Sequence, residues 1–172
     1  MRKLGLIMGT IVTAASLLFC LTVNAHAAKD EKAIADIEHK MIATTNTDEL
    51  MKYYDQSDVD VYDLAGPLQY SGNAAVRGDF DNVFTNFAGA KGNFVELVVV
   101  ADGKLGMARS IQHFAWTDKA GKPQAVTVRV TDVFHKVYGQ WIGHSHAHLG
   151  ADGSQDRPDS DEFEVVEGFT PS

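Results

Sequence analysis

Hydrophobic residues recur at helical spacing in the first half of the chain. Between Asp30 and Thr45 an apolar residue returns every three or four positions and charged residues fill the others, which is typical of an amphipathic helix. Asn46 or Thr47 is a suitable N-cap for a second, short helix, whose first turn then carries the acidic Asp48. The clearest helical stripe comes next and consists of Val76, Phe80, Val83, Phe84 and Phe87. The pattern therefore predicts three helices.

Apolar and polar residues alternate in the second half of the chain, as they do in strands that bury one face. Two short runs, 59–63 and 68–70, come before the third helix. The four long runs are residues 94–101, 105–117, 124–137 and 140–148. Short turns join them into an antiparallel meander. This order predicts an α+β fold: about three helices pack on a strongly curved, mainly antiparallel sheet of four to six strands and leave a cone-shaped interior.

The N-terminus has the three-part order of a secretory signal peptide. Two basic residues precede an apolar run from Leu4 to Val23, and the small-x-small site Ala25-His26-Ala27 follows. We therefore expect residues 1–27 to be a leader that is cleaved after Ala27, and the protein to be exported to the periplasm or secreted. The alternatives are an uncleaved membrane anchor and a lipoprotein linked through Cys20.

The composition of the chain argues against some partners and some kinds of catalysis. The chain has 23 acidic and 15 basic residues, a formal net charge of -8, and this excess argues against nucleic acid as a partner because it repels phosphates. Its one cysteine, Cys20, lies in the predicted leader, so cleavage would leave no thiol for catalysis or for metal binding. Residues 28–149 have the length of one domain. Residues 150–172 are acidic and without periodicity, which predicts a flexible tail.

Six short motifs follow one another in order between Ile34 and His148. They are Val61-Tyr62-Asp63-Leu64, Pro67-Leu68-Gln69-Tyr70, Asp102-Gly103, Arg129-Val130-Thr131-Asp132-Val133-Phe134, Gly139-Gln140-Trp141 and His144-Ser145-His146. Their order and spacing resemble those of the SnoaL-like, ketosteroid-isomerase-related group of the NTF2-like superfamily. The resemblance implies a conical pocket and a homodimer. It implies no particular reaction, because the group is functionally scattered.

Arg129 and Thr131 share one face of the strand 124–134, and the opposite face is rich in valine. The valine-rich face is expected to form the core beneath the helices or a dimer surface. The face with Arg129 is then either the pocket or the solvent side. In the pocket, the guanidinium would bind a ligand carboxylate or stabilise an enolate, and strand pairing could bring His113 close to it. On the solvent side, Arg129 would be exposed or paired with an acidic residue.

His144, His146 and His148 alternate along the last strand and are expected to point to one face. Same-face neighbours lie roughly 6.6 Å apart, so two of them could chelate one metal ion if a neighbouring strand supplied a third ligand, such as His113 or Asp132. The other interpretations are an acid–base or binding histidine in the pocket and a hydrogen-bonded wall residue.

Ketosteroid-isomerase chemistry requires a carboxylate base and a hydroxyl donor inside an apolar cone. Asp63 and Asp132 are the candidate bases, and Tyr62 and Tyr53 are the candidate donors. The pair Tyr62-Asp63 would equally fit the polar end of an edge strand.

Together these patterns predict an exported protein whose conical pocket binds a small, largely apolar, oxygenated molecule, with isomerase- or lyase-like proton transfer as its chemistry. The alternative is a non-catalytic, dimeric ligand-binding or assembly module of the same fold. We expect no cofactor, no metal, and no membrane partner after cleavage. The candidate catalytic residues are His144, His146 and Asp63, and the candidate ligand-binding residues are Arg129, Thr131, His113, Tyr62 and Trp116.

Overall fold

The computed structural model describes residues 26–63 and 67–150. The predicted leader lies outside the described residues except for His26 and Ala27, and the predicted tail lies outside them from residue 151 onward. Within the described ranges, no helix combines the length and the apolar character that a membrane crossing requires.

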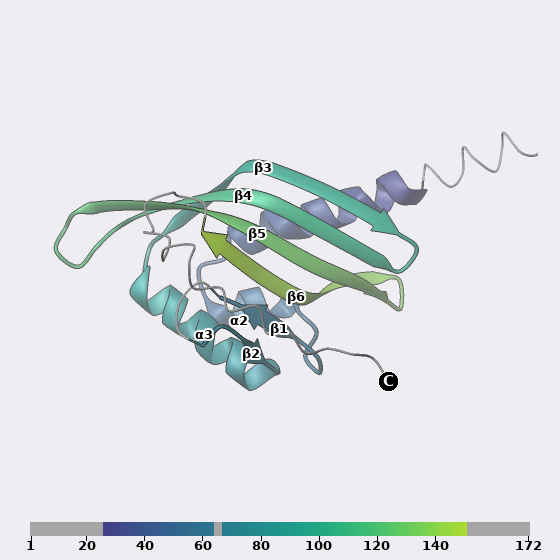
Figure 1. The fold of residues 1–172 in the computed structure, drawn as a ribbon, viewed down its shortest axis with the longest axis horizontal. Helices are drawn as coiled ribbons and strands as arrows, with labels where there is room; N and C mark the ends of the chain where they lie inside the picture. Colours follow the sequence, from purple (N-terminus) through teal and green to yellow (C-terminus); the bar gives the residue numbers. More distant parts are fainter. Residues whose placement is uncertain (1–25, 64–66, 151–172) are drawn as a thin grey trace, which may run out of the picture.

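Six strands form a single mixed sheet in the order β2–β1–β6–β5–β4–β3 (Figure 1). Each long strand pairs antiparallel with its neighbour in the chain, as the short turns between them predict. The long strands are β3 (Lys91–Asp102), β4 (Leu105–Thr117), β5 (Pro123–Val137) and β6 (Gln140–Gly150). They bend along their length and form a curved, elongated surface (Figure 1).

Two short strands extend this sheet beside β6. β1 (Asp60–Tyr62) pairs antiparallel with β2 (Tyr70–Ser71) and parallel with β6. The parallel pairing sets Tyr62 opposite Ala147, so the chain leaves β1 near the C-terminal end of β6. This brings Asp63, the next residue, close to the histidines of the last strand.

Helices precede the four long strands, as the apolar stripes predict. The first described helix, residues 26–42, is called the N-terminal helix here. A short helix α2 (Thr47–Leu50) follows, and the side chain of Asn46 caps it by accepting a 2.9 Å hydrogen bond from the backbone N–H of Glu49. The 3-10 turn η1 (Met51–Tyr53) and, after β2, the helix α3 (Asn73–Asn86) complete the set.

The N-terminal helix and α3 cover one face of the sheet, called the inner face here (Figure 1). Ile34 of the N-terminal helix sits so close to Gly106 of β4 that a Cβ at position 106 would lie 2.3 Å from the Ile34 Cδ1 atom. Hydrophobic burial between these layers is the main stabilising contribution. The largest fully buried apolar side chains are Phe134, Ile34, Met51, Val59, Val61, Val76 and Val130. The predicted α+β cone is confirmed.

A β-bulge interrupts β6. Val133 of β5 pairs with Ser145, but the next residue, Phe134, pairs with Gly143, so His144 has no partner across the ladder. Trp141 and His146 therefore both face inward, although strict alternation would put them on opposite faces. The bulge therefore changes the face to which the side chains after His144 point, and this segment carries His146 and His148.

Candidate functional site

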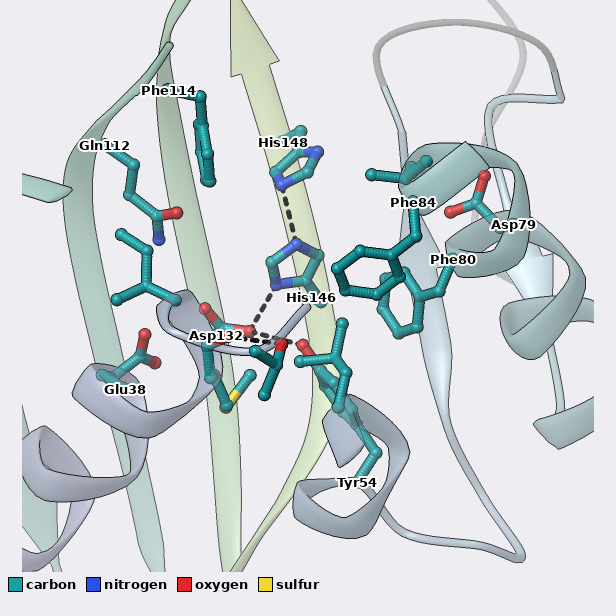
Figure 2. A pocket seen from close by; sticks show the side chains of 15 residues that line it. Glu38, Tyr54, Asp79, Phe80, Phe84, Gln112, Phe114, Asp132, His146 and His148 are labelled. Atoms are coloured by element: carbon teal, nitrogen blue, oxygen red, sulfur yellow. Dashed lines mark hydrogen bonds and ion pairs between the residues drawn. The ribbon is translucent and has the colours of Figure 1, made fainter. Parts of the chain in front are cut away.

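A cavity of about 120 Å³ lies between the inner face of the sheet and the helices that cover it (Figure 2). Most of its wall is hydrocarbon, with a group of polar side chains at the centre of the sheet. The lining residues are Glu38, Met41, Ile42, Thr44, Leu50, Tyr54, Asp79, Phe80, Val83, Phe84, Gln112, Phe114, Asp132, His146 and His148. Of the α3 stripe, Val76 packs into the core, Phe80 contacts both the core and the cavity, and Val83 and Phe84 cover the cavity.

Asp132 anchors the polar group. Its carboxylate is buried, and its Oδ1 atom lies 2.5 Å from Nδ1 of His146, which is buried on the neighbouring strand (Figure 2). The hydroxyl of Tyr54 donates a second, longer hydrogen bond of 3.4 Å to the same oxygen. This arrangement orients the imidazole and stabilises its protonated form.

His146 continues the polar chain to His148. The two Nε2 atoms are 2.8 Å apart, a distance at which one nitrogen must carry a proton and the other must accept it. On the far side of His148, Nδ1 lies 3.5 Å from Oδ1 of Asp63. The polar chain therefore runs from Asp132 through two imidazoles to Asp63.

The two histidines have opposite pKa shifts. Burial alone would lower the pKa of His146, but the negative charge of Asp132, the hydrogen bond to it and two further carboxylates outweigh burial and raise that pKa above its usual value. Burial and the positive charge of His146 lower the pKa of His148, and Asp63 opposes this only in part. Of the two imidazoles, His146 therefore has the higher pKa and holds the shared proton more strongly, and His148 is the acceptor.

Glu38 of the N-terminal helix is buried beside Asp132. Burial, the negative charge of Asp132 and a hydrogen bond between the two carboxyl groups raise the pKa of Glu38 to about 10. No amide, hydroxyl or amine of the described residues donates to Glu38 Oε1 or Asp132 Oδ2. Glu38 is thus a neutral carboxylic acid at pH 7, and Asp132 keeps the negative charge that faces His146.

A second pair of carboxyl groups lies at the other end of the chain. Burial and the negative charge of Asp63 raise the pKa of Asp79 on α3, while a hydrogen bond with Tyr70 opposes the shift. Asp79 and Asp63 also interact through a hydrogen bond that favours the protonated form of Asp79. The two histidines therefore lie between two carboxyl pairs.

The structure brings together four of the histidine and carboxylate candidates. His146 and His148 line the cavity, and Asp63 contacts His148 without lining the cavity itself. Asp132, considered both as a base and as a metal ligand, forms the anchor of the group. The catalytic roles of His146 and Asp63 stay predictions.

His144 lies elsewhere, which corrects the prediction that all three histidines share one face. The bulge turns it to the outer side, where its Nδ1 lies 3.0 Å from the backbone oxygen of Asp58 and its ring stacks at 5.2 Å on His135. A metal site spanning the three histidines is therefore not formed. Within residues 26–63 and 67–150, no three His, Cys, Asp or Glu side chains are grouped in a way that could hold a metal ion.

The prediction that Arg129, Thr131 and His113 lie in the pocket is also corrected, because all three lie on the outer face. Arg129 is exposed, and none of the three lines the cavity. His113 instead forms a 3.0 Å hydrogen bond between its Nδ1 and the hydroxyl of Thr127. The valine-rich face is the one that covers the cavity, because the helices pack on it.

The aromatic candidates Tyr62, Tyr53 and Trp116 also lie outside the cavity. Tyr62 is 43% exposed, and Tyr53 is half-buried at the edge of the core. Trp116 lies farther along β4 and packs edge-to-face on Phe87, with ring centroids 5.0 Å apart. The hydroxyl donor in the site is Tyr54, one residue after the predicted Tyr53.

Sequence reasoning missed Glu38, Tyr54, Asp79 and Gln112. For the two acidic residues, Glu38 and Asp79, the sequence contains a signal that could have identified them. Glu38 falls four residues after Ile34, inside the apolar stripe of its helix, and Asp79 falls three residues after Val76 in the same way. An acidic residue at an apolar position of an amphipathic helix indicates a buried carboxyl group, which is a common feature of functional sites.

A family model of the SnoaL-like domain matches residues 32–150 of the chain. No curated protein matches the chain. A solved structure of an NTF2-like superfamily protein from Salmonella enterica serovar Typhimurium LT2 is 14% identical and has a TM-score of 0.66; the match covers 83% of this chain and 99% of that one.

Two further solved structures carry an activity in their names. A candidate dehydratase of the NTF2-like family from Streptomyces avermitilis is 14% identical with a TM-score of 0.64, and the match covers 73% of this chain and 99% of that one. A candidate ketosteroid isomerase from Parabacteroides distasonis ATCC 8503 is 15% identical with a TM-score of 0.59, and the match covers 70% and 86%. At these identities the similarity establishes the fold.

Proposed function

The chain belongs to the SnoaL-like domain family, and on this basis we propose that its cavity binds a small, largely apolar, oxygenated molecule and moves a proton between carbon and oxygen on it. The observation that carries the proposal is the pair of touching imidazoles, His146 and His148, with opposite pKa shifts beside an apolar cavity. Titratable neighbours whose pKa values are pushed apart are the general signature of an acid–base pair. The fold shared with a candidate isomerase and a candidate dehydratase is consistent with this class of reaction.

The roles of the two histidines follow from their protonation. His148 is the base, because it is neutral and its Nε2 carries a lone pair. His146 is the acid, because the negative charge of Asp132 keeps it protonated. Tyr54 stays protonated, since burial and nearby carboxylates raise its pKa, and it helps to hold Asp132 in place.

The step can be written for a ligand that carries a carbonyl group. His148 Nε2 takes a proton from the carbon next to the carbonyl, and His146 Nε2 gives its proton to the carbonyl oxygen. The product is an enol, with His148 now charged and His146 neutral. Return of the hydroxyl proton to His146 and of the proton on His148 to the same carbon restores the ketone with its α-hydrogen exchanged. Where a carbon–carbon double bond is conjugated with the enol, transfer of the proton on His148 to the far end of that double bond completes an isomerisation, with all protons conserved.

The size of the cavity limits the ligand. A cavity of about 120 Å³ is on the scale of the one that holds a benzene molecule in an engineered protein core, roughly 150 Å³. We therefore propose a ligand the size of one six-membered ring. A fused-ring steroid would require a displacement of the lining side chains.

The proposal is tested by hydrogen exchange on a ketone of this size. Cyclohexanone in D₂O should exchange its α-hydrogens faster with the protein than in buffer, as followed by proton NMR. His148→Gln and His146→Gln should each lower the protein-catalysed rate by about 10²-fold or more, because general acid–base catalysis contributes roughly 10²–10⁴. His39→Gln, on the exposed side of the N-terminal helix, is the matched control and should keep the wild-type rate.

The pH dependence of the exchange rate gives a second test. Activity requires neutral His148 and charged His146, so the rate should fall below the lowered pKa of His148 and above the raised pKa of His146. The profile is therefore expected to be a bell on either side of about pH 6.5. Saturable binding of cyclohexanone with no exchange above the buffer rate would contradict catalysis and favour a binding module.

The alternative function, a dimeric binding or assembly module, is favoured by the outer face of the sheet. Three apolar side chains remain substantially exposed there: Leu105 at 65%, Val100 at 47% and Met107 at 37%. Exposed apolar residues grouped on one sheet face favour association with a second apolar surface. We propose a homodimer formed through this face, and a monomeric mass by sedimentation equilibrium at micromolar concentration would contradict it.

We further propose that the protein is exported, on the strength of its N-terminal residues. Expression of the full chain in a bacterium with a periplasm, followed by fractionation and N-terminal sequencing, tests this. A mature N-terminus at Ala28 is the expected result. Uncleaved protein in the cytosolic fraction would contradict export.

A further inference from the structure

Gln112 stands apart from the polar chain that runs through the histidines. It comes from β4 on the opposite side of the cavity, and only 6% of it is exposed (Figure 2). We propose that the cavity selects a neutral molecule with a hydroxyl or N–H donor, and that Gln112 is the residue that recognises this donor. The inference rests on the proposed function, because it assumes that the same cavity holds the ligand.

The orientation of the Gln112 amide is set by a neighbour on the same strand. Its Nε2 donates a 2.9 Å hydrogen bond to the hydroxyl of Ser110, which is also buried. This bond uses the donor end of the amide and leaves the carbonyl oxygen, Oε1, free to face the cavity (Figure 2). Among the described residues, the only hydrogen bond of the Gln112 amide is the one that its Nε2 donates to Ser110, so Oε1 accepts none from them.

An unpaired amide oxygen has a cost when an apolar ligand enters. Phe114, two residues along β4, and Phe84 on α3 make the surroundings of the cavity apolar. A ligand that displaces water from Oε1 without replacing its hydrogen bond leaves a buried polar group desolvated, which weakens binding by roughly tenfold or more. A ligand that donates to Oε1 avoids this cost. The amide therefore discriminates between ligands of equal shape.

The charges around the cavity favour a neutral ligand. The lining residues include no lysine and no arginine, so an anionic ligand would find no permanent cation. The one positive charge, on His146, is already paired with Asp132 at 2.5 Å. A carboxylate or phosphate would also lie close to Asp132 and Asp79. A cationic amine would add a second positive charge beside His146, while the negative charge of Asp132 is already paired with that histidine and Glu38 is neutral.

The experiment compares phenol and toluene, two rings of nearly equal shape that differ in one hydroxyl donor. Dissociation constants are measured by isothermal titration calorimetry on the wild type, Gln112→Leu and the control Gln140→Leu, which changes an exposed glutamine at the start of β6. Gln112→Leu should weaken phenol binding by about tenfold, since one neutral hydrogen bond is lost, and should tighten toluene binding by severalfold, since the unpaired oxygen that toluene desolvates is gone. Gln112→Met keeps the unbranched side chain and should give the same result if the leucine variant folds poorly.

The outcomes separate this inference from the proposed function. Equal loss of phenol and toluene affinity, or none, in the Gln112 variants would overturn the role of Gln112, and tighter binding of benzoate than of phenol would overturn the preference for neutral ligands. Failure of the wild type to bind any of the three rings would overturn the cavity as a ligand site and the proposed function with it. Proton transfer is judged separately by the exchange of cyclohexanone.

Discussion

The substitution Glu38→Gln should remove much of the pH dependence of the protein's stability. In the folded protein Glu38 is protonated, with its pKa raised from 4.5 to about 10, because it is buried beside Asp132. The unfolded chain ionises this group near pH 4.5, so folding at neutral pH requires the uptake of one proton. A raised folded-state pKa gives a stability contribution that is complete below pH 4.5 and is lost as the pH rises toward 10. Glutamine has nearly the same shape as protonated glutamic acid and takes up no proton.

The magnitude follows from linkage. Between pH 4.5 and 10, one extra proton bound by the folded state lowers the free energy of unfolding by about 1.4 kcal/mol for each pH unit. The difference in stability between Glu38→Gln and the wild type should therefore grow by roughly 4 kcal/mol from pH 5 to pH 8, in favour of the variant. His146 also loses stabilisation as the pH rises above 6.5, but it does so in both proteins and cancels in the difference.

Urea denaturation followed by tryptophan fluorescence at pH 5, 6, 7 and 8 measures this difference directly. Glu96→Gln, which changes an exposed glutamate on β3, is the matched control and should follow the wild type at every pH. A stability difference for Glu38→Gln that stays constant across the four pH values would refute the reasoning, because it would mean that Glu38 is already ionised in the folded protein. A lower stability of the variant at pH 8 would refute it as well.

The other predictions concern the anchor of the histidine pair and the packing of the sheet. Asp132→Asn removes the charge that raises the pKa of His146, so the alkaline limb of the cyclohexanone exchange profile should move to lower pH; an unmoved limb would contradict the assignment of His146 as the acid. Gly106→Ala should lower the free energy of unfolding by roughly 1–3 kcal/mol, because its Cβ would lie 2.3 Å from the Ile34 Cδ1 atom. Gly78→Ala in α3, where nothing lies within 4 Å of the new Cβ, should instead stabilise by roughly 0.5–1 kcal/mol, and thermal melts that rank the two variants otherwise would contradict this packing argument.

The fold was predictable from the sequence because its elements are long and strongly periodic. The stripe from Val76 to Phe84 and the alternation along residues 124–137 each allow one regular structure, and the short turns leave little freedom in how the strands connect. The NTF2-like cone and its mainly antiparallel sheet follow from these features and are confirmed by the structure and its solved relatives.

The site was predictable only in part, for two physical reasons. Alternation divides β5 into two faces but does not say which face the helices cover, so Arg129 was assigned to the cavity although the opposite face, with Asp132, lines it. The buried carboxylate is tolerated there because His146 and Tyr54 both donate to its Oδ1 atom, and both partners are distant in sequence. Cross-strand compensation of this kind leaves no local pattern in the chain.

The bulge at His144 divides β6 into two halves, and the alternation of inward and outward side chains is shifted by one residue between them. The half before it directs Trp141 into the packing beneath the N-terminal helix, and the half after it directs His146 and His148 into the cavity. Regular pairing of all eleven residues would put either Trp141 or the two histidines on the outer face. Because one unpaired residue separates the two halves of β6, the imidazoles can change without disturbing the packing that keeps the molecule folded.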